Sequence, residues 1–350
     1  MNKQSLNVGE TDTVRYFHES IFRETFRNGN RSLQSNTFNR VVDLDLELIS
    51  KDNKLRSSSF VAKSFDDFNE SKTFAAGTHF EYESRNLYVG FNPTYIGENF
   101  NAEVGFVPSS GVYPGQIYYQ TELSYRFYPE HKSLIWTGPS LIIDHVYIPG
   151  GELTDKDYKL SYSFNFINTA ILEFSYNHIF QRLPRDFSLV DPARYDPFLA
   201  GEQYTWQTGA VSFQSNTRKV FNFLVETIYG SFYNGTNFNV NGQLNYRYQP
   251  YGNVSLQFDY NDLKLPDNYG KEKLFLIGPR VDLTLSDKVF LTTYVQYNNL
   301  LDNMNLNARF QWRYQPASDL FIVYTENYFP GEFNSKNRAL VFKLTYWLNF

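Results

Sequence analysis

The chain has 350 residues, is 20% charged and 19% aromatic, and carries a formal net charge of −5. It contains no Cys, which excludes a disulfide framework and thiolate metal sites, and no apolar run approaches the ~20 residues that a membrane-spanning helix needs. The mild acidity and the lack of a Lys/Arg stripe give no indication of nucleic-acid binding.

These averages fit two classes of protein. A soluble β-protein rich in Tyr and Asn can have the mean hydropathy of −0.46 that is found here. A transmembrane β-barrel can have it too, because only alternate residues meet lipid while the others line a polar lumen. The phase of the alternation along each strand therefore has to distinguish the two classes.

The beginning of the chain is polar and irregular. Val14–Phe26 carries apolar residues among charges, which fits either a short amphipathic helix or a first strand. Met1–Gly9 lacks the apolar core of a signal peptide, and because a barrel must cross the inner membrane we expect a leader or upstream region in the full gene product. Residues 1–35 are interpreted as an irregular lead-in or partial first strand, and residues 36–350 as one barrel domain.

From Thr37 onward there are about 17 runs, each near the ~10 residues of a tilted membrane strand. In Asn239–Gln249 the even-numbered residues are mostly apolar, and the residues between them are Asn, Gln and Arg. Val42–Leu48, Val254–Asn261 and Asn305–Tyr314 show the same alternation. Period two is the strand period, so each run has one apolar and one polar face.

The connections between these runs alternate in length. Short turns are expected at 50–53, 85–86, 129–132, 168–169, 216–219, 249–252, 286–287 and 315–318. Longer loops are expected at 66–72, 97–116, 149–156, 184–203, 266–272 and 330–337. This is the pattern of bacterial outer-membrane barrels, whose short turns are periplasmic and whose long loops are extracellular. Aromatic residues at the short-turn rim predict an interfacial girdle: Tyr125, Phe127, Tyr246, Tyr248, Trp312, Tyr314 and Tyr346.

The last fourteen residues, Asn337–Phe350, continue the alternation to the end of the chain. Counted back from Phe350, every second residue is large and apolar, beginning with Leu348 and Tyr346. A final strand that ends on an aromatic residue is typical of bacterial outer-membrane barrels. Tyr346, Leu348 and Phe350 are therefore interpreted as the barrel-closing signal, with the C-terminus on the periplasmic side.

Together these patterns predict an all-β fold: a closed, antiparallel, up-and-down transmembrane β-barrel of about 16–18 strands in the bacterial outer membrane. The alternative is a soluble antiparallel β-sandwich or β-propeller in which each sheet has one solvent-exposed face. Against it stand the many consecutive hairpins, which leave no set of inward apolar positions for a second layer. A soluble protein also could not leave so many aromatic-rich faces exposed.

The polar phase carries charges of both signs. An Arg or Lys costs ~2–4 kcal/mol at the lipid midplane, so the charges are expected to face the lumen. Early strands contribute mainly acids and late strands mainly Arg, which predicts two opposed walls and a transverse field, as in porin constrictions. A plugged, salt-bridged interior is the alternative. The predicted lumen charges are Asp43, Asp45, Glu47, Glu81, Glu122, Arg126, Arg247, Asp259, Arg280, Asp282, Arg309, Arg313 and Glu326.

Two long loops, Gly97–Gln116 and Pro184–Gln203, are candidates for a constriction. The first has hydrophobic content of its own and is expected to pack inward or along the wall, while the second either folds into the barrel or caps it from outside. The candidate constriction residues are Phe100, Glu103, Phe106, Arg194 and Tyr195.

No catalytic residue, metal site or cofactor is predicted. His178 falls on the lipid-facing phase and His145 near a rim, and both are interpreted as girdle residues. The sequence has no Gly-x-Ser-x-Gly, His-Glu-x-x-His or phosphate loop.

Three stretches, Asn99–Pro108, Ser318–Tyr324 and Asn337–Tyr346, resemble a family of bacterial outer-membrane proteins of unknown function, found in Bacteroidota and other bacteria. In that family a module similar to family 9 carbohydrate-binding domains precedes a C-terminal barrel. The resemblance covers residues 36–350, the barrel half. The chain departs from the family pattern in lacking the module and in having Ser109-Ser110-Gly111 where an Arg-containing continuation is expected.

Three functions are compatible with these features. The first is a porin-like channel or uptake pore for small polar solutes, with saccharides among them. The second is a membrane anchor or display platform for an upstream carbohydrate-binding-like module or a partner protein. The third and least favoured is a barrel hydrolase. The expected partners are outer-membrane lipid, the barrel-assembly machinery during insertion, and a saccharide or partner protein, with no nucleic acid.

Overall fold

A computed structural model describes residues 14–23, 38–102, 114–190, 193–300, 302–331 and 334–348. It holds one sheet of eighteen strands. No helix that could cross a membrane is found in these residues. The strands are β1 Val14–Arg23, β2 Phe38–Ile49, β3 Leu55–Asp66, β4 Phe74–Glu83, β5 Leu87–Ile96, β6 Gln116–Tyr125, β7 Leu134–Tyr147, β8 Leu153–Phe166, β9 Ile171–Arg182, β10 Gln203–Gln214, β11 Phe221–Phe232, β12 Gly235–Tyr248, β13 Gly252–Lys264, β14 Lys271–Thr284, β15 Val289–Asn298, β16 Asn303–Gln315, β17 Ser318–Phe329 and β18 Asn334–Thr345.

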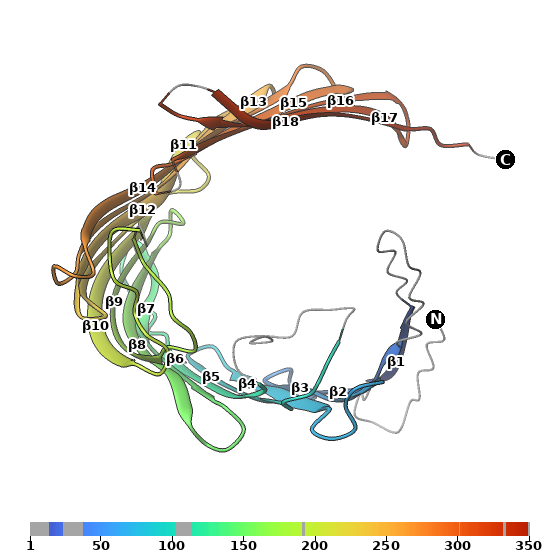
Figure 1. Cartoon of the computed structure of the whole chain (residues 1–350). Helices are drawn as coiled ribbons and strands as arrows, with labels where there is room; N and C mark the ends of the chain where they lie inside the picture. The colour runs from blue at the N-terminus through green and yellow to red at the C-terminus, as the bar shows by residue number, and fades with distance from the viewer. Residues whose placement is uncertain are drawn as a thin grey trace.

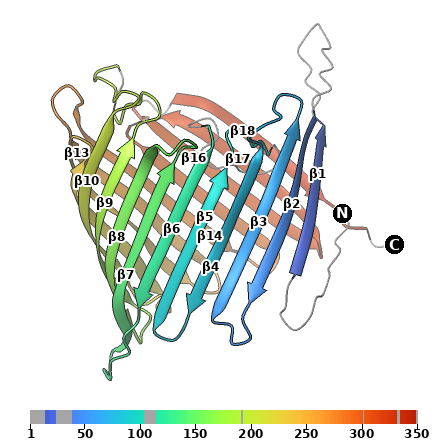
Figure 2. The ribbon, with the colours of Figure 1, turned by 90° about the horizontal axis from the view of Figure 1, so that it is seen from below.

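The strands follow an up-and-down order. Each pairs antiparallel with the next in sequence, from β1 with β2 to β17 with β18. The sheet curls around a central axis (Figure 1), and its strands are tilted to that axis (Figure 2). The predicted fold class is confirmed. Val14–Arg23 forms the first strand, one of the two interpretations that the sequence left open.

The two edge strands remain apart. In the described residues neither a pairing nor a close backbone contact joins β18 to β1, and Figure 1 shows the edges separated. The expected closure of the sheet is therefore not seen. Because β18 has a neighbour on one side only, it is exposed on both faces: Val341 is 53% exposed and Leu344 68%.

The register defines two continuous faces, because directly opposed residues in an antiparallel pair point the same way. Phe310 lies opposite Leu291 on β15 and Ile322 on β17. Its neighbour Arg309 lies opposite Thr292 on β15. The face that contains Phe310 is called here the apolar face and the face that contains Arg309 the polar face. Followed from strand to strand, the pairings carry both faces around the sheet.

The polar face lines the inside of the curve. The loop between β9 and β10 lies on the inner side of the sheet in Figure 1. Its Phe198 packs in a cluster with Tyr204, Phe232 and Leu263, and the register places these three on the polar face. The apolar face is consequently the outside of the barrel.

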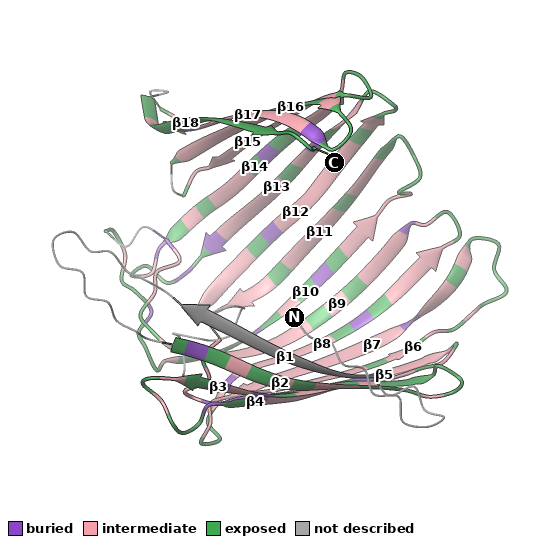
Figure 3. Cartoon of the chain, turned by 90° about the vertical axis from the view of Figure 1, so that its right-hand side faces the viewer, coloured by how far each residue is buried: buried purple, intermediate pink, exposed green. Residues whose placement is uncertain are grey.

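Burial excludes the soluble alternative. The described apolar side chains that are fully buried are few and scattered (Figure 3), and the clusters they form lie near the long-loop rim. A sandwich would bury the apolar face of each sheet against a second layer. Here that face is open, as a lipid-facing surface requires.

The two rims differ as predicted. Short connections, such as 84–86 and 316–317, lie at one rim, and longer ones, such as 97–115 and 183–202, at the other. The exceptions are the short connections 233–234, 299–302 and 330–333 at the long-loop rim and the longer connection 126–133 at the short-turn rim.

The final strand is shorter than the alternation indicates. It ends at Thr345, because Asp319 is the last residue of β17 with a partner on β18. Trp347 N–H then donates to Ser318 Oγ at 3.0 Å, outside the ladder. Tyr346 and Leu348 are exposed after the strand, and Phe350 lies outside the described residues.

Candidate functional site

On the polar face, the acidic residues of β2 to β6 form one group and the arginines of β12 to β16 form another, in which Asp259 and Asp282 also lie. The acidic wall consists of Asp43, Asp45 and Glu47 on β2, Glu81 and Glu83 on β4, and Glu122 on β6. The arginine wall consists of Arg247 on β12, Arg280 on β14, and Arg309 and Arg313 on β16. Figure 1 shows β2 to β5 across the barrel from β15 to β18, with β12 and β14 on the side between them. Arg309 and Arg313 on β16 therefore lie on the opposite side of the barrel from the acidic residues of β2 and β4.

Part of the acidic wall is compensated by basic neighbours. Glu81 lies 3.4 Å from Arg56 and 3.5 Å from His79. Arg126, which follows β6, lies 3.2 Å from Glu83 at the short-turn rim. These are partly exposed pairs, so each stabilises the fold by at most about 1 kcal/mol.

Each member of the arginine wall is held differently. Arg247 donates to the backbone oxygen of Lys219 at 2.8 Å, which ties it to a turn. Arg280 makes two hydrogen bonds to Asp282, at 2.9 and 3.0 Å. Arg313 lies 3.6 Å from Asp319. Arg309 is exposed and makes no ion pair or side-chain hydrogen bond with any residue that the structure describes.

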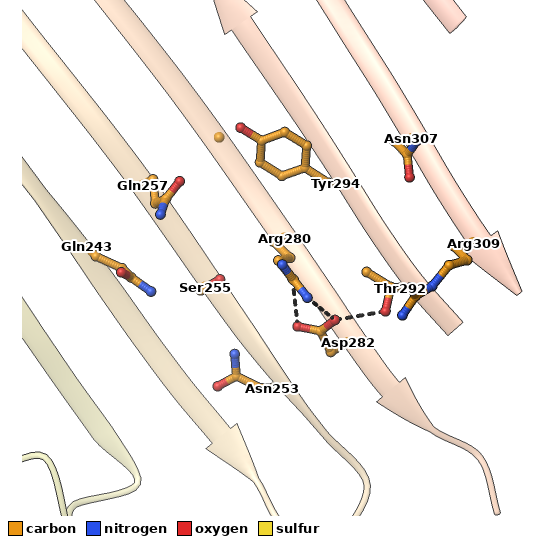
Figure 4. A pocket seen from close by; sticks show the side chains of 11 residues that line it. Gln243, Asn253, Ser255, Gln257, Arg280, Asp282, Thr292, Tyr294, Asn307 and Arg309 are labelled. Carbon is orange, nitrogen blue, oxygen red and sulfur yellow. Dashed lines mark hydrogen bonds and ion pairs between the residues drawn. The ribbon is translucent and has the colours of Figure 1, made fainter. Parts of the chain in front are cut away.

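A pocket of about 560 Å³ is set into this wall. It is lined by Gln243, Asn253, Ser255, Gln257, Gly278, Arg280, Asp282, Thr292, Tyr294, Asn307 and Arg309. All of these belong to the polar face of β12 to β16, and Figure 4 shows them projecting from neighbouring strands. Its volume falls within the ~300–1,000 Å³ typical of small-molecule sites.

The ion pair within β14 is braced from the neighbouring strand. Thr292 Oγ1 on β15 donates to Asp282 Oδ1 at 2.9 Å (Figure 4). The Asp282 carboxylate therefore accepts from both Arg280 and Thr292, and charge-assisted bonds of this kind fix the geometry of a site.

An aromatic ring forms part of the pocket surface. Tyr294 lies over Gly278, where an added Cβ would be 3.1 Å from the Tyr294 hydroxyl oxygen and 3.2 Å from its ring. A glycine at this point lets the ring approach the backbone of β14 (Figure 4).

The described parts of both candidate loops turn inward. Phe100 packs against a small cluster of Ala62, Ala75 and Ile96 on the polar face, and Asn101 N–H donates to Ser64 Oγ at 3.0 Å. Glu103 and Phe106 lie outside the described residues.

The second loop is anchored more extensively. Phe198 stacks on Tyr269 with ring centroids 4.6 Å apart, and Phe187 and Phe198 exchange backbone hydrogen bonds of 3.1 and 2.9 Å. Tyr195 packs against the same cluster and covers Gly270, while Arg194 lies 6.0 Å from the Tyr195 ring. Of the two predicted arrangements, the loop adopts the one that folds over the inside of the wall.

One predicted lumen charge is wrong. Glu326 lies opposite Leu306 on β16 and Arg338 on β18, which places it on the apolar face near the long-loop rim. Its carboxylate accepts hydrogen bonds from the hydroxyls of Tyr324 and Tyr328, its neighbours on the same face. These partners stabilise a charge at a lipid-facing position. The other predicted lumen charges on strands lie on the polar face.

The histidines singled out from the sequence also lie on the apolar face. His145 Nε2 is 3.0 Å from the Tyr158 hydroxyl, and His178 Nδ1 is 3.4 Å from Gln207 Nε2. In the part of the chain that the structure describes, no group of His, Asp and Glu side chains is placed to hold a metal ion.

The uncharged residues that line the pocket were not predicted from the sequence. Tyr294, Thr292 and Gln257 belong to the polar phase of their strands, but nothing local marks them as one site. Only the pairing of β13 with β14 and of β14 with β15 brings them together.

Comparison with known proteins finds no matching family model and no matching curated protein. Among solved structures, the ferric enterobactin receptor PfeA in complex with BCV-L6 aligns with a TM-score of 0.44 and 9% identity over 96% of this chain and 73% of that chain. A double mutant of PfeA from Pseudomonas aeruginosa gives 0.46 and 7% over 92% and 68%. A triple mutant of Rh. blastica porin gives 0.36 and 10% over 82% and 93%. By its own strands, register and exposed apolar face, the chain is an antiparallel, up-and-down β-barrel of the transmembrane type.

Proposed function

We propose that this protein is a channel or uptake pore for small polar solutes in the bacterial outer membrane, with saccharides among the solutes. The observation that carries the proposal is the accessibility of the charges on the inside of the barrel. The side chains of Arg280 and Arg313 are 51% and 49% exposed. A plugged interior would cover such side chains with protein, whereas a water-filled one leaves them accessible.

The two walls suggest how the pore selects among solutes. Opposed acidic and basic side chains create a field across the lumen, which orients dipolar solutes and favours polar over apolar ones. The inward loops 97–102 and 183–202 supply aromatic surface at the entrance. The exposed apolar face and the aromatic short-turn rim support insertion in lipid, with the long loops outside the cell and the C-terminus in the periplasm.

Conductance through the purified protein in a planar lipid bilayer tests the proposal. We expect discrete current steps. Glu47→Gln combined with Glu122→Gln should shift the reversal potential in a salt gradient toward anion selectivity, and Arg309→Gln should shift it toward cation selectivity. Arg338→Gln, on the apolar face, is the control and should leave selectivity unchanged. A folded, inserted barrel that gives no steps above background would contradict a pore.

The inward packing of both loops favours a second candidate, in which the barrel is a membrane anchor or display platform for a carbohydrate-binding-like module or partner protein. The resemblance to the Bacteroidota family points the same way. Absent conductance together with a partner that co-purifies with the full-length protein would select this function over the pore.

A further inference from the structure

We propose that the pocket on β12 to β16 is a binding site for an anionic saccharide, a polyhydroxylated solute with a carboxylate group. The inference rests on the proposed function in one respect, since the solute must reach the inside of the barrel. It goes further by naming the chemical class of the solute and the residues that recognise it.

The charge of the pocket is the first reason. Its charged lining residues are Arg280, Asp282 and Arg309. Arg280 and Asp282 compensate each other through their paired hydrogen bonds. Arg309 makes no ion pair or hydrogen bond with a carboxylate among the described residues, although Asp282 also attracts it electrostatically, so the three groups leave one net positive charge for a ligand. A guanidinium binds a carboxylate through two parallel hydrogen bonds, which matches a single acidic group.

The nearest other carboxylate on the polar face of β13 does not compete for Arg309. Asp259 accepts hydrogen bonds from Asn239 at 2.8 Å and from Asn261 at 2.7 Å, toward the long-loop rim. Both of these hydrogen bonds lie within β12 and β13, on the side of Asp259 away from the pocket lining.

The neutral lining is the second reason. Asn253 and Gln257 make no side-chain hydrogen bond with another residue in the described part of the chain, and both face the pocket (Figure 4). An amide both donates and accepts, as a sugar hydroxyl does. Two free amides beside a free guanidinium therefore suit a ligand that combines hydroxyls with an acid.

The third reason is Tyr294. The ring lies against Gly278 and beside the polar groups of the pocket (Figure 4). A sugar ring has an apolar face of C–H groups as well as its hydroxyls, and an aromatic surface next to a few convergent polar groups is the usual composition of a small-molecule site. A simple inorganic anion would use only Arg309.

Binding can be measured without conductance. The full-length protein in detergent micelles is titrated by isothermal calorimetry with lactobionate, a sugar acid that carries one carboxylate. Acetate and lactose, the neutral counterpart of lactobionate, are the comparison ligands. We expect lactobionate to bind more tightly than either. Arg309→Gln should weaken its affinity about tenfold or more, the effect of losing a charge-assisted hydrogen bond. Arg309→Lys keeps the positive charge and should therefore weaken the affinity less than Arg309→Gln does.

Arg56→Gln is the matched control, because Arg56 lies on the polar face of β3 across the barrel and pairs with Glu81. Unchanged affinity for lactobionate in Arg309→Gln, or an equal loss in Arg56→Gln, overturns the site. Acetate binding as tightly as lactobionate overturns the saccharide assignment. Binding without conductance would reject the pore and keep the site, whereas conductance without binding would reject the site and keep the pore.

Discussion

At the scale of single residues, close contact between strands decides which glycines can be replaced. A Cβ added to Gly230 on β11 would lie 2.2 Å from the backbone oxygen of Gln207 on β10. At Gly209 on β10 the nearest atom would be the backbone oxygen of Ser175, at 4.0 Å. A carbonyl in a hydrogen-bonded ladder cannot rotate away, so only the first position forces the backbone to move.

We predict that Gly230→Ala lowers the free energy of unfolding by about 1–3 kcal/mol, the usual effect of overpacking. Gly209→Ala is the matched control and should be neutral or slightly stabilising, because it restricts the unfolded chain without a clash. Urea unfolding of both variants in lipid vesicles measures the difference. Equal effects at the two glycines would contradict the close approach of β10 to β11.

A second prediction at this scale concerns the turn between β2 and β3. Hydrogen bonds from the Ser50 hydroxyl and from Lys54 hold the pKa of the Asp52 carboxyl at about 2, below its ordinary value of 3.8. Because the folded pKa is the lower one, the turn is stabilised fully above pH 3.8, and this contribution is lost as the pH falls toward 2.

The Asp52 carboxyl should therefore still be charged at pH 3, as followed by carbon-13 NMR of the protein in micelles. Ser50→Ala removes the hydrogen bond that lowers the pKa of Asp52 most, and should move the titration midpoint upward. Titration of Asp52 near 3.8 in the unmodified protein would refute the turn geometry.

At the scale of the element, Phe198 is the most deeply buried side chain of the loop 183–202, in a cluster that also holds Leu183 and Val190. Phe198 is 1% exposed and stacks on Tyr269, whereas its neighbour Leu199 is 50% exposed. The loop also carries Arg185 and Arg194, which are sites for trypsin. The buried ring is therefore expected to contribute more to the order of the loop than its exposed residues do.

Phe198→Ala should release the loop, since removing a buried Phe side chain typically costs about 3–5 kcal/mol. We expect trypsin to cleave after Arg194 at least several-fold faster in this variant, as measured by mass spectrometry of timed digests. Leu199→Ala is the control and should be cleaved at the original rate. No acceleration in Phe198→Ala would show that the loop is held by other contacts.

At the scale of the whole molecule, the assignment of inside and outside determines everything that is proposed about solutes. Gln257 and Phe258 are neighbours at one depth of β13 and belong to opposite faces. The chain has no native Cys, so a single Cys at either position is a unique probe.

In lipid vesicles, Gln257→Cys should react with a water-soluble maleimide, because it faces the inside of the barrel. Phe258→Cys should stay unlabelled and become reactive only after detergent solubilisation or unfolding. Labelling yield by mass spectrometry gives the comparison. The reverse pattern would place Arg309 and the pocket in lipid and remove the basis for both proposals.

Much of the fold was predictable because its signal is local. The alternation in Asn239–Gln249 and Asn305–Tyr314 specifies two faces without knowledge of any partner strand, and the turn lengths specify the two rims. Glu326 shows where this signal fails. In β17 apolar residues occur on both phases, with Ile322 on one and Val323 on the other, so only the pairing with β16 assigns the face.

The sequence by itself determined the antiparallel class, the polar phase of most charges and the grouping of acids early and Arg late in the chain. Only the tertiary structure decided that β12 to β16 form one pocket, that residues 183–202 fold inside the wall, and that β18 and β1 stay unpaired. The physical reason is the separation along the chain of the residues that set each feature. Alternation is set by backbone geometry over a few residues, whereas a pocket depends on the register of strands that are distant in the chain.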